Sequence, residues 1–236
     1  RPSSAHDARV DISVLVSDWD GHRLLDSGDG FKLEEIGGVR MIRSEPKAWW
    51  SKSLPAAEWA RAVAEHEEGG REGRWKLKGN CPKEWETKLG KLRFQLRFMD
   101  NSKQFGVFAE QSPHWKWVAE RPQKLEPRPR LLNLFGYTGA ASLGAAQAGW
   151  HVTHVDASKP AVAWGRRNQE LSGMAQEPIR WIIEDAMTFV KREVKRGNQY
   201  EAIMLDPPAF GRGPTGEFWK VERDLAPLLR ACRELL

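Results

Sequence analysis

The sequence predicts an α/β protein in which a parallel β-sheet flanked by helices follows a smaller β-rich domain. Strand and helix patterns alternate throughout residues 126–236, which is typical of a parallel sheet covered by helices. Residues 1–125 instead contain short apolar or alternating runs separated by turn signals, which predict strands. Three prolines (Pro122, Pro127 and Pro129) lie between the two patterns and predict a domain boundary near residue 125.

Composition and charge limit the possible classes of function. The 236 residues carry a net charge of +5, and this basic balance permits a polyanionic partner such as RNA. No apolar run reaches the length of about 18 residues that a membrane span needs. The two cysteines, Cys81 and Cys232, lie far apart in the sequence. We therefore expect neither a disulfide framework nor a metal site, and we expect the protein to work in the reducing cytoplasm.

The N-terminal half is expected to contain several short strands and one helix. A tight-turn signal at Asp20-Gly21 precedes the second apolar run, and the last run alternates strictly between apolar and polar residues. Helix-forming composition predicts a helix over residues 56–68, ending at Gly69-Gly70. The predicted strands are residues 12–16, 22–25, 39–43 and 92–98.

Tryptophan is concentrated in the same half, where eight of the twelve Trp residues precede residue 120. Aromatic rings beside cations can stack on RNA bases, but they equally serve as the core of a small β domain. We favour the core interpretation. The residues concerned are Trp49, Trp50, Trp75, Trp85, Trp115 and Trp117.

The C-terminal half reads as a regular series of strands and helices. Apolar runs predict strands, and longer amphipathic segments between them predict helices. The predicted strands are residues 130–134, 151–156, 181–184 and 202–205, and the predicted helices are residues 140–148, 160–171, 186–195 and 218–236.

The loop after the first of these strands is the strongest candidate for a ligand site. In open α/β sheets, ligands bind at the carboxyl ends of strands near the switch in strand order. Gly136 and Gly139 allow the loop Asn133–Gly139 to turn tightly and to approach a ligand closely. The helix that follows presents free N–H groups to a carboxylate.

Two acidic residues follow the next strands and extend this site. Asp156, twenty residues after Gly136, can accept hydrogen bonds from both hydroxyls of an adenosine ribose. Asp185 can accept from an adenine amino group. An Asp that ends a strand is also a common helix cap, and Asp156, followed by Lys159-Pro160, is a candidate for one. The loop lacks the glycine triplet of dinucleotide sites and the Gly-Lys-Ser/Thr of a P-loop. These features favour a cofactor with adenosine but no phosphate, such as S-adenosylmethionine.

A Pro-rich motif, Asp206-Pro207-Pro208-Ala209-Phe210, follows the fourth predicted strand. Consecutive prolines fix the backbone and remove two N–H donors. The neighbouring carbonyls can then act as rigid acceptors for a planar base, on which Phe210 can stack. The motif therefore indicates the place where a nucleobase is held.

These motifs resemble those of class I S-adenosylmethionine-dependent methyltransferases, and most closely the bacterial 23S ribosomal RNA methyltransferases that modify cytosine C5 or guanine N7. A Gly-x-Phe-x-Glu-Gln segment at residues 106–111 belongs to the resemblance, which covers roughly residues 92–225. It implies a Rossmann-like methyltransferase domain with ribosomal RNA as substrate and no metal. The implied cofactor-binding residues are Glu110, Gln111, Asn133, Phe135, Gly136, Tyr137, Thr138, Gly139, Asp156, Ala157, Ser158, Asp185, Ala186 and Asp206, and the candidate catalytic residues are Asp206, Pro207, Pro208 and Phe210.

The sequence also departs from that family. The family has three further strands after the point that corresponds to Leu236, so we expect a truncated domain. Methylation at C5 needs a cysteine nucleophile, but Cys232 lies in a leucine-rich helix pattern and is expected in the core. Two alternatives remain: a nicotinamide-dependent oxidoreductase, and an RNA-binding protein with an inactive methyltransferase fold.

Overall fold

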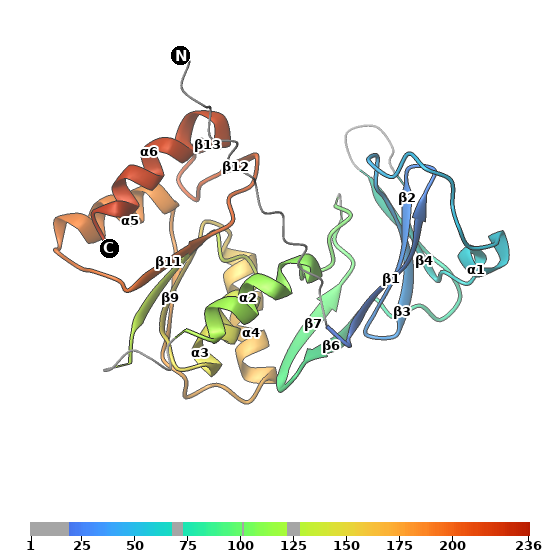
Figure 1. The fold of residues 1–236 in the computed structure, drawn as a ribbon, viewed down its shortest axis with the longest axis horizontal. Coiled ribbons are helices and arrows are strands. Elements are labelled where there is room, and N and C mark those ends of the chain that lie inside the picture. The colour runs from blue at the N-terminus through green and yellow to red at the C-terminus, as the bar shows by residue number, and fades with distance from the viewer. Residues whose placement is uncertain (1–18, 68–72, 101, 122–127) are drawn as a thin grey trace, which may run out of the picture.

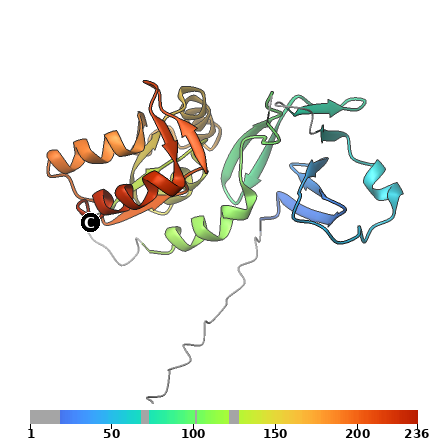
Figure 2. The same cartoon turned by 90° about the horizontal axis from the view of Figure 1, so that it is seen from above.

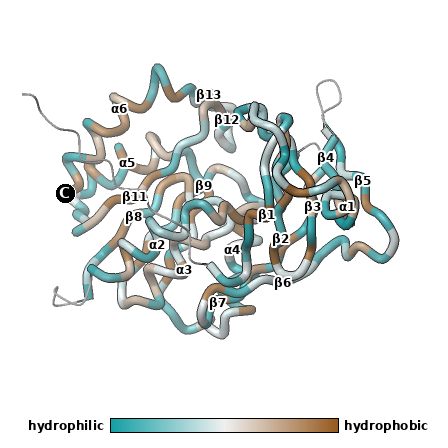
Figure 3. The backbone as a smooth tube through the Cα atoms, turned by 45° about the vertical axis from the view of Figure 1, so that its right-hand side comes forward, coloured by the Kyte–Doolittle hydropathy of each residue, from teal (hydrophilic) through white to brown (hydrophobic). Residues whose placement is uncertain are grey.

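The computed structural model describes residues 19–67, 73–100, 102–121 and 128–236, in which an N-terminal sheet, a hairpin and an α/β layer follow one another (Figure 1). The predicted strand at 12–16 and the predicted boundary near residue 125 lie outside the described residues. Among the described elements, no helix is both long and apolar enough to cross a membrane. Apolar stretches lie along strands of the N-terminal sheet and along strands of the α/β layer (Figure 3).

The N-terminal sheet has five strands in the order β1-β2-β3-β4-β5, and all neighbours are antiparallel except β3 and β4. The predicted strands at 22–25 and 39–43 are confirmed within β1 and β3. The strands are β1 (His22–Gly28), β2 (Phe31–Ile36), β3 (Val39–Ser44), β4 (Ala64–Glu67) and β5 (Arg74–Leu77).

The predicted helix over residues 56–68 is wrong in its second half. Helix α1 covers only Ala56–Ala60, and β4 follows it. Burial alternates along β4 with a period of two, which suits a strand paired on both sides rather than a helix. Helix α1 is held in place by Trp59, whose indole N–H donates to the buried Asp26 carboxylate at 2.9 Å.

The Trp residues of this half divide between core and surface. Trp75 and Trp85 both pack on the Phe98 ring, and Trp115 is buried, so the core interpretation is confirmed for these three. It is wrong for the remaining three, which are more than half exposed: Trp49, Trp50 and Trp117.

The α/β layer contains a parallel sheet in the order β10-β9-β8-β11, which confirms the predicted fold class. The chain runs outward from β8 to β10 and then returns to add β11 on the other side of β8. The strand order therefore switches between β8 and β11. The elements are β8 (Arg130–Leu134), α3 (Ala140–Gln147), β9 (His151–Asp156), α4 (Lys159–Leu171), β10 (Ile179–Ile183), α5 (Ala186–Lys195), β11 (Ala202–Leu205) and α6 (Val221–Arg233).

The end of the chain differs from the predicted helix over residues 218–236. Residues 218–220 form β13 (Phe218–Lys220), which pairs with β12 (Phe210–Arg212), and α6 begins only at Val221. The intervening Gly213-Pro214-Thr215-Gly216 turns the chain back on itself, which explains why these residues pair instead of joining the helix.

A hairpin of β6 (Glu84–Leu89) and β7 (Leu92–Arg97) lies between the N-terminal sheet and the α/β layer (Figure 2). Its free edge is covered by side chains of α4 and its C-cap. Asn168 accepts from the amide of Gln95, and the Trp164 indole donates to the carbonyl of the same residue, both at 2.9 Å. Ser172 bonds both the amide and the carbonyl of Arg93. These side chains recur every four residues, so one helix face satisfies the edge of β7.

The loop after β8 has a strained backbone. Phe135 and Tyr137 both adopt positive φ angles of 57° and 51°, a conformation that residues other than glycine rarely adopt. Two hydrogen bonds to the end of β9 hold this shape. The amide of Gly136 donates to the carbonyl of Val155 at 3.1 Å, and the amide of Tyr137 donates to the carboxylate of Asp156 at 2.8 Å.

The two glycines of this loop are required because the rings of buried side chains pack directly against them. A Cβ at Gly136 would lie 2.3 Å from the His154 ring, and a Cβ at Gly139 would lie 2.6 Å from the Trp181 ring. Gly139 also has a φ of 82°. Packing against the protein core therefore requires both glycines, and the expected close approach of a ligand to this loop stays a prediction.

We expect Gly139→Val to destabilise the fold by about 2–5 kcal/mol, because it combines a left-handed backbone with a clash against Trp181. The matched control is Gly173→Val, since Gly173 has a φ of +67° but a Cβ at this position would meet nothing within 4 Å. That variant should lose only about 1–2 kcal/mol. Urea unfolding of both variants measures the difference, and equal losses would contradict the packing argument.

Candidate active site

Two adjoining hollows lie at the carboxyl ends of the parallel strands, where the strand order switches. Their volumes are about 350 and 500 Å³, which is the usual size range for a small-molecule site. Phe108, Phe135, Tyr137 and Asp206 line both hollows and so form the rim between them.

The structure brings most of the sequence-predicted residues together around these hollows. Three of the sequence-predicted residues line neither hollow. Glu110 is exposed beside the first hollow, Gly139 is buried at the start of α3, and Phe210 is 72% exposed on β12. Those that line one or both hollows are Gln111, Asn133, Phe135, Gly136, Tyr137, Thr138, Asp156, Ala157, Ser158, Asp185, Ala186, Asp206, Pro207 and Pro208.

Asp156 lies at the end of β9 with its carboxylate fixed by two backbone amides. One oxygen accepts from Tyr137 and the other from Ser158, each at 2.8 Å. Burial raises the pKa of Asp156, and these two hydrogen bonds only partly oppose that rise. Helix α4 is capped by Ser158, which accepts from the amide of Ala161, so Asp156 is not its cap. Asp156 also lines the second hollow, where its remaining lone pairs are available to a ligand.

Asp185 is the N-cap of α5. One carboxylate oxygen accepts from the amide and the hydroxyl of Thr188, at 2.9 and 3.0 Å. The helix-cap interpretation therefore describes this residue in the structure. Asp185 still lines the second hollow, so the predicted contact with adenine remains a prediction.

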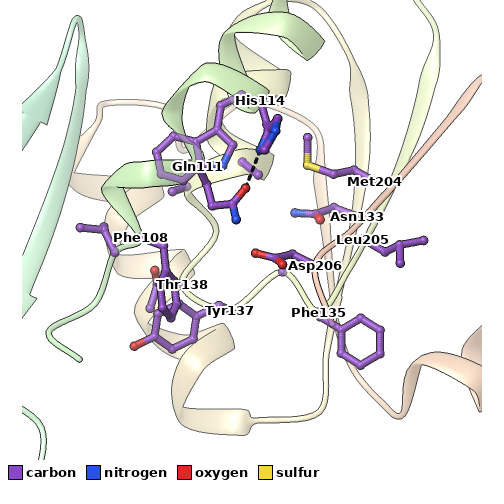
Figure 4. Close-up of a pocket in the computed structure, with 15 residues that line it drawn as sticks. Phe108, Gln111, His114, Asn133, Phe135, Tyr137, Thr138, Met204, Leu205 and Asp206 are labelled. Atoms are coloured by element: carbon purple, nitrogen blue, oxygen red, sulfur yellow. Dashed lines mark hydrogen bonds between the residues drawn. The ribbon is translucent and has the colours of Figure 1, made fainter. Parts of the chain in front are cut away.

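The first hollow contains a group of polar side chains around Asp206. Gln111, His114, Asn133 and Asp206 point towards a common space, and Gln111 bonds His114 at 2.6 Å (Figure 4). Burial raises the pKa of Asp206 and the charge of Glu110 raises it further, while His114 opposes the rise. A carboxylate with a raised pKa at a ligand-sized hollow is a candidate proton acceptor.

Sequence reasoning missed His114, because it missed the helix α2 (Ser112–Ala119) that carries it. The usable signal was Pro113, since proline is favoured in the first turn of a helix. A helix beginning there would have placed His114 one turn from Gln111 and beside the resemblance segment.

Asn133 is oriented from below by a buried chain of hydrogen bonds. Its amide donates to Ser142 at 2.9 Å, and Ser142 bonds Nδ1 of His154 at the same distance. Burial lowers the pKa of His154 to about 3, so its ring is neutral at physiological pH. This chain fixes the side chain of Asn133 at the floor of the first hollow.

The segment that carries Phe108 and Gln111 is fastened over the loop. The hydroxyl of Thr138 donates to the carbonyl of Gly106 at 2.5 Å, and the rings of Phe108 and Tyr137 lie 5.5 Å apart. Gly106 has a φ of 119°, and a Cβ there would lie 2.4 Å from the Trp164 ring. The glycine of the Gly-x-Phe segment is thus required for this close packing.

Solved structures share this architecture. A structure of an S-adenosylmethionine-dependent methyltransferase from Agrobacterium tumefaciens is 44% identical, with a TM-score of 0.90 over 94% of this chain and 71% of that one. A structure from Streptococcus mutans, described as a methyltransferase of the same kind, is 18% identical with a TM-score of 0.69 and shares the fold. It covers 92% of this chain and 58% of the other.

Curated relatives match a smaller part of the chain. Ribosomal RNA large subunit methyltransferase K/L from Hahella chejuensis is 36% identical over 133 residues, which are 56% of this chain and 17% of the relative. The protein of the same name from Methylococcus capsulatus is 38% identical over 109 residues, which are 45% of this chain and 15% of that protein. The chain thus spans about a sixth of the length of these two relatives.

A family model described as S-adenosylmethionine-dependent methyltransferase matches residues 16–236, which is nearly the whole chain. The match confirms the resemblance drawn from the motifs. The chain belongs to the S-adenosylmethionine-dependent methyltransferase family.

Proposed function

We propose that this chain transfers the methyl group of S-adenosylmethionine to a base in RNA, and that this RNA is ribosomal. The observation that carries the proposal is the position of Asp206 on the rim between the two hollows, beside the loop after β8. The printed name of the K/L relatives supports ribosomal RNA as the substrate. The predicted division into a domain of residues 1–125 and one of 126–236 is part of the same proposal.

The residues around the hollows fit the cofactor in two parts. In the second hollow, the Asp156 carboxylate can accept from the ribose hydroxyls, and Asp185 and Ala186 lie where the adenine would reach. In the first hollow, the start of α3 presents backbone N–H groups to the methionyl carboxylate, because no side chain caps this helix. Gln111 and Thr138 line the same hollow.

The sulfonium of the cofactor supplies a methyl group that is already activated for transfer. The task of the protein is then to position the acceptor, which can lower the barrier by about 7–11 kcal/mol. The carbonyl of Pro208 accepts from the Trp219 indole at 2.8 Å and so anchors the following hairpin. The Asp206 carboxylate and the Pro207 carbonyl are then the candidate acceptors for an N–H of the base, and the raised pKa of Asp206 favours proton uptake.

The two alternative functions predict different results in assays of NAD binding, RNA binding and methyl transfer. An oxidoreductase would bind NAD, which the family match does not favour. An inactive RNA-binding relative would bind RNA without transferring a methyl group.

Cys232 is buried in the core, as the sequence predicts. Burial raises the pKa of its thiol to about 11, and the residue lines neither hollow.

Incubation with methyl-labelled S-adenosylmethionine and total RNA tests the proposal directly. We expect label in the RNA, and nucleoside analysis will identify the base that carries it. Label-free RNA from a protein that binds S-adenosylhomocysteine would support the inactive alternative instead.

We expect Asp156→Ala to weaken binding of S-adenosylhomocysteine by about 10- to 150-fold, because a charged hydrogen bond of about 1.5–3 kcal/mol is lost. Titration calorimetry measures the affinity, and thermal unfolding checks that the fold persists. Glu170→Ala is the matched control, since Glu170 is an exposed carboxylate on α4 that pairs only with Arg167 among the described residues. Normal affinity in Asp156→Ala would refute the ribose assignment.

We expect Asp206→Ala to bind S-adenosylhomocysteine nearly normally and yet to lose methyl transfer, because Asp206 contacts the acceptor more than the cofactor. The sequence-based expectation for Phe210→Ala is the same. Single-turnover rates and cofactor affinities of the same variants separate the two steps. Parallel losses of cofactor affinity and stability would instead assign Asp206 a structural role.

The raised pKa of Asp206 also predicts a pH dependence. Because burial and Glu110 raise this pKa, the ionised form that accepts a proton is lost at a higher pH than for an ordinary Asp. The single-turnover rate should therefore fall as the pH falls through that raised value. In the residual transfer rate of Asp206→Asn this acid limb should be absent, and its persistence would mean that another group titrates.

A further inference from the structure

The hairpin of β12 and β13 follows Pro208 along the chain (Figure 1). Its two faces carry different side chains. Its cross-strand pairs are Phe210 with Lys220, Gly211 with Trp219, and Arg212 with Phe218. Because side chains alternate along a strand, Phe210, Arg212, Phe218 and Lys220 share one face. Gly211 and Trp219 lie on the other. We call the first face the hairpin platform.

The opposite face of the hairpin is anchored beside the candidate active site. Trp219 is 6% exposed, its indole donates to Pro208, and its ring lies 4.9 Å from that of Phe135. Gly211 and Trp219 line the second hollow, and Arg212 of the platform lines it as well. The platform is therefore held at a fixed position relative to the rim of the site.

The platform itself is exposed and apolar at its two aromatic positions. Phe210 is 72% exposed and Phe218 is 49% exposed, and no described ring or cation stacks on either. Most of the Phe210 side chain and about half of the Phe218 side chain are therefore open to solvent. Rings left open in this way can accept other planar groups.

Each of these rings has a cation directly opposite it on the neighbouring strand. Arg212 and Lys220 are exposed and make no ion pair among the described residues. Two carboxylates of the adjoining turn and helix are engaged elsewhere: Glu217 accepts from Thr215, and Asp224 accepts from Arg223 and from the amide of Lys220. The platform thus alternates exposed rings with exposed cations that form no ion pair among the described residues.

We propose that the hairpin platform binds single-stranded RNA that flanks the methylated base. This rests on the proposed function, because it assumes that the neighbouring site acts on RNA. Aromatic rings stack on bases of any sequence while Lys and Arg contact the phosphates, which is the pattern of single-strand binding surfaces. Duplex RNA hides its base faces and so cannot use the two rings.

Fluorescence anisotropy with labelled polyadenylate tests the stacking role. We expect Phe218→Leu to weaken binding about tenfold, because the loss of one base stack has that effect. Phe218→Trp should retain the affinity, since it retains a ring. The matched control is Phe31→Leu, because Phe31 is also exposed but lies on β2 of the N-terminal sheet. Thermal unfolding of each variant checks that the fold is intact.

The two cations of the platform are tested by the salt dependence of RNA binding. Arg212→Ala and Lys220→Ala should each reduce the slope of log affinity against log salt by about one, as expected for a lost phosphate contact. Lys191→Ala, on α5, should leave the slope unchanged. Wild-type affinity for polyadenylate in Phe218→Leu, or equal binding of duplex RNA, would overturn the proposal.

Failure of the platform can be distinguished from failure of the proposed function. Methyl transfer to RNA by the wild-type chain, together with unchanged polyadenylate binding by Phe218→Leu, would reject the platform alone. The absence of methyl transfer, together with weakened binding by Phe218→Leu, would reject the proposed function and retain the platform as an RNA-binding surface.

Discussion

The hydrogen bond between the Asp156 carboxylate and the amide of Tyr137 is the constraint on which the site depends. It joins the end of β9 to the loop after β8 and holds a non-glycine residue in a left-handed conformation. Such a backbone is maintained only where the surroundings over-determine it. Asp156 itself lines the second hollow, and the same loop contributes Phe135 and Tyr137 to the rim between the two hollows. This one hydrogen bond therefore sets both the shape of the loop around the hollows and the position of the Asp156 carboxylate, the proposed acceptor for the ribose hydroxyls.

Several hydrogen bonds join the N-terminal half of the chain to the elements around this site. Helix α4 covers the free edge of β7 and so joins the hairpin to the α/β layer. On the other side, Arg43 makes two hydrogen bonds to Glu34, at 2.7 and 3.0 Å, and reaches Gln104 of the segment beside the second hollow. Burial alone would raise the pKa of Glu34, but hydrogen bonds from His22 and Arg43 lower it to about 2. The pair therefore remains charged and anchors the segment.

Much of the fold and of the site follows from the sequence, because both depend on periodicity and on strand ends. The strands at 130–134 and 202–205 and the helix at 186–195 have the predicted bounds. Local composition could not reveal that residues 64–67 and 218–220 pair as strands, since distant partners decide this. It also could not show that Gly136 and Gly139 avoid His154 and Trp181, which is a tertiary contact.

A crystal structure of the chain with S-adenosylhomocysteine tests the central claim most directly. The account predicts that the ligand extends across both hollows, with its ribose hydroxyls within hydrogen-bonding distance of Asp156 and its sulfur next to Asp206. A ligand that occupies the hollows without contacting Asp156, or whose sulfur lies remote from Asp206, would contradict the account.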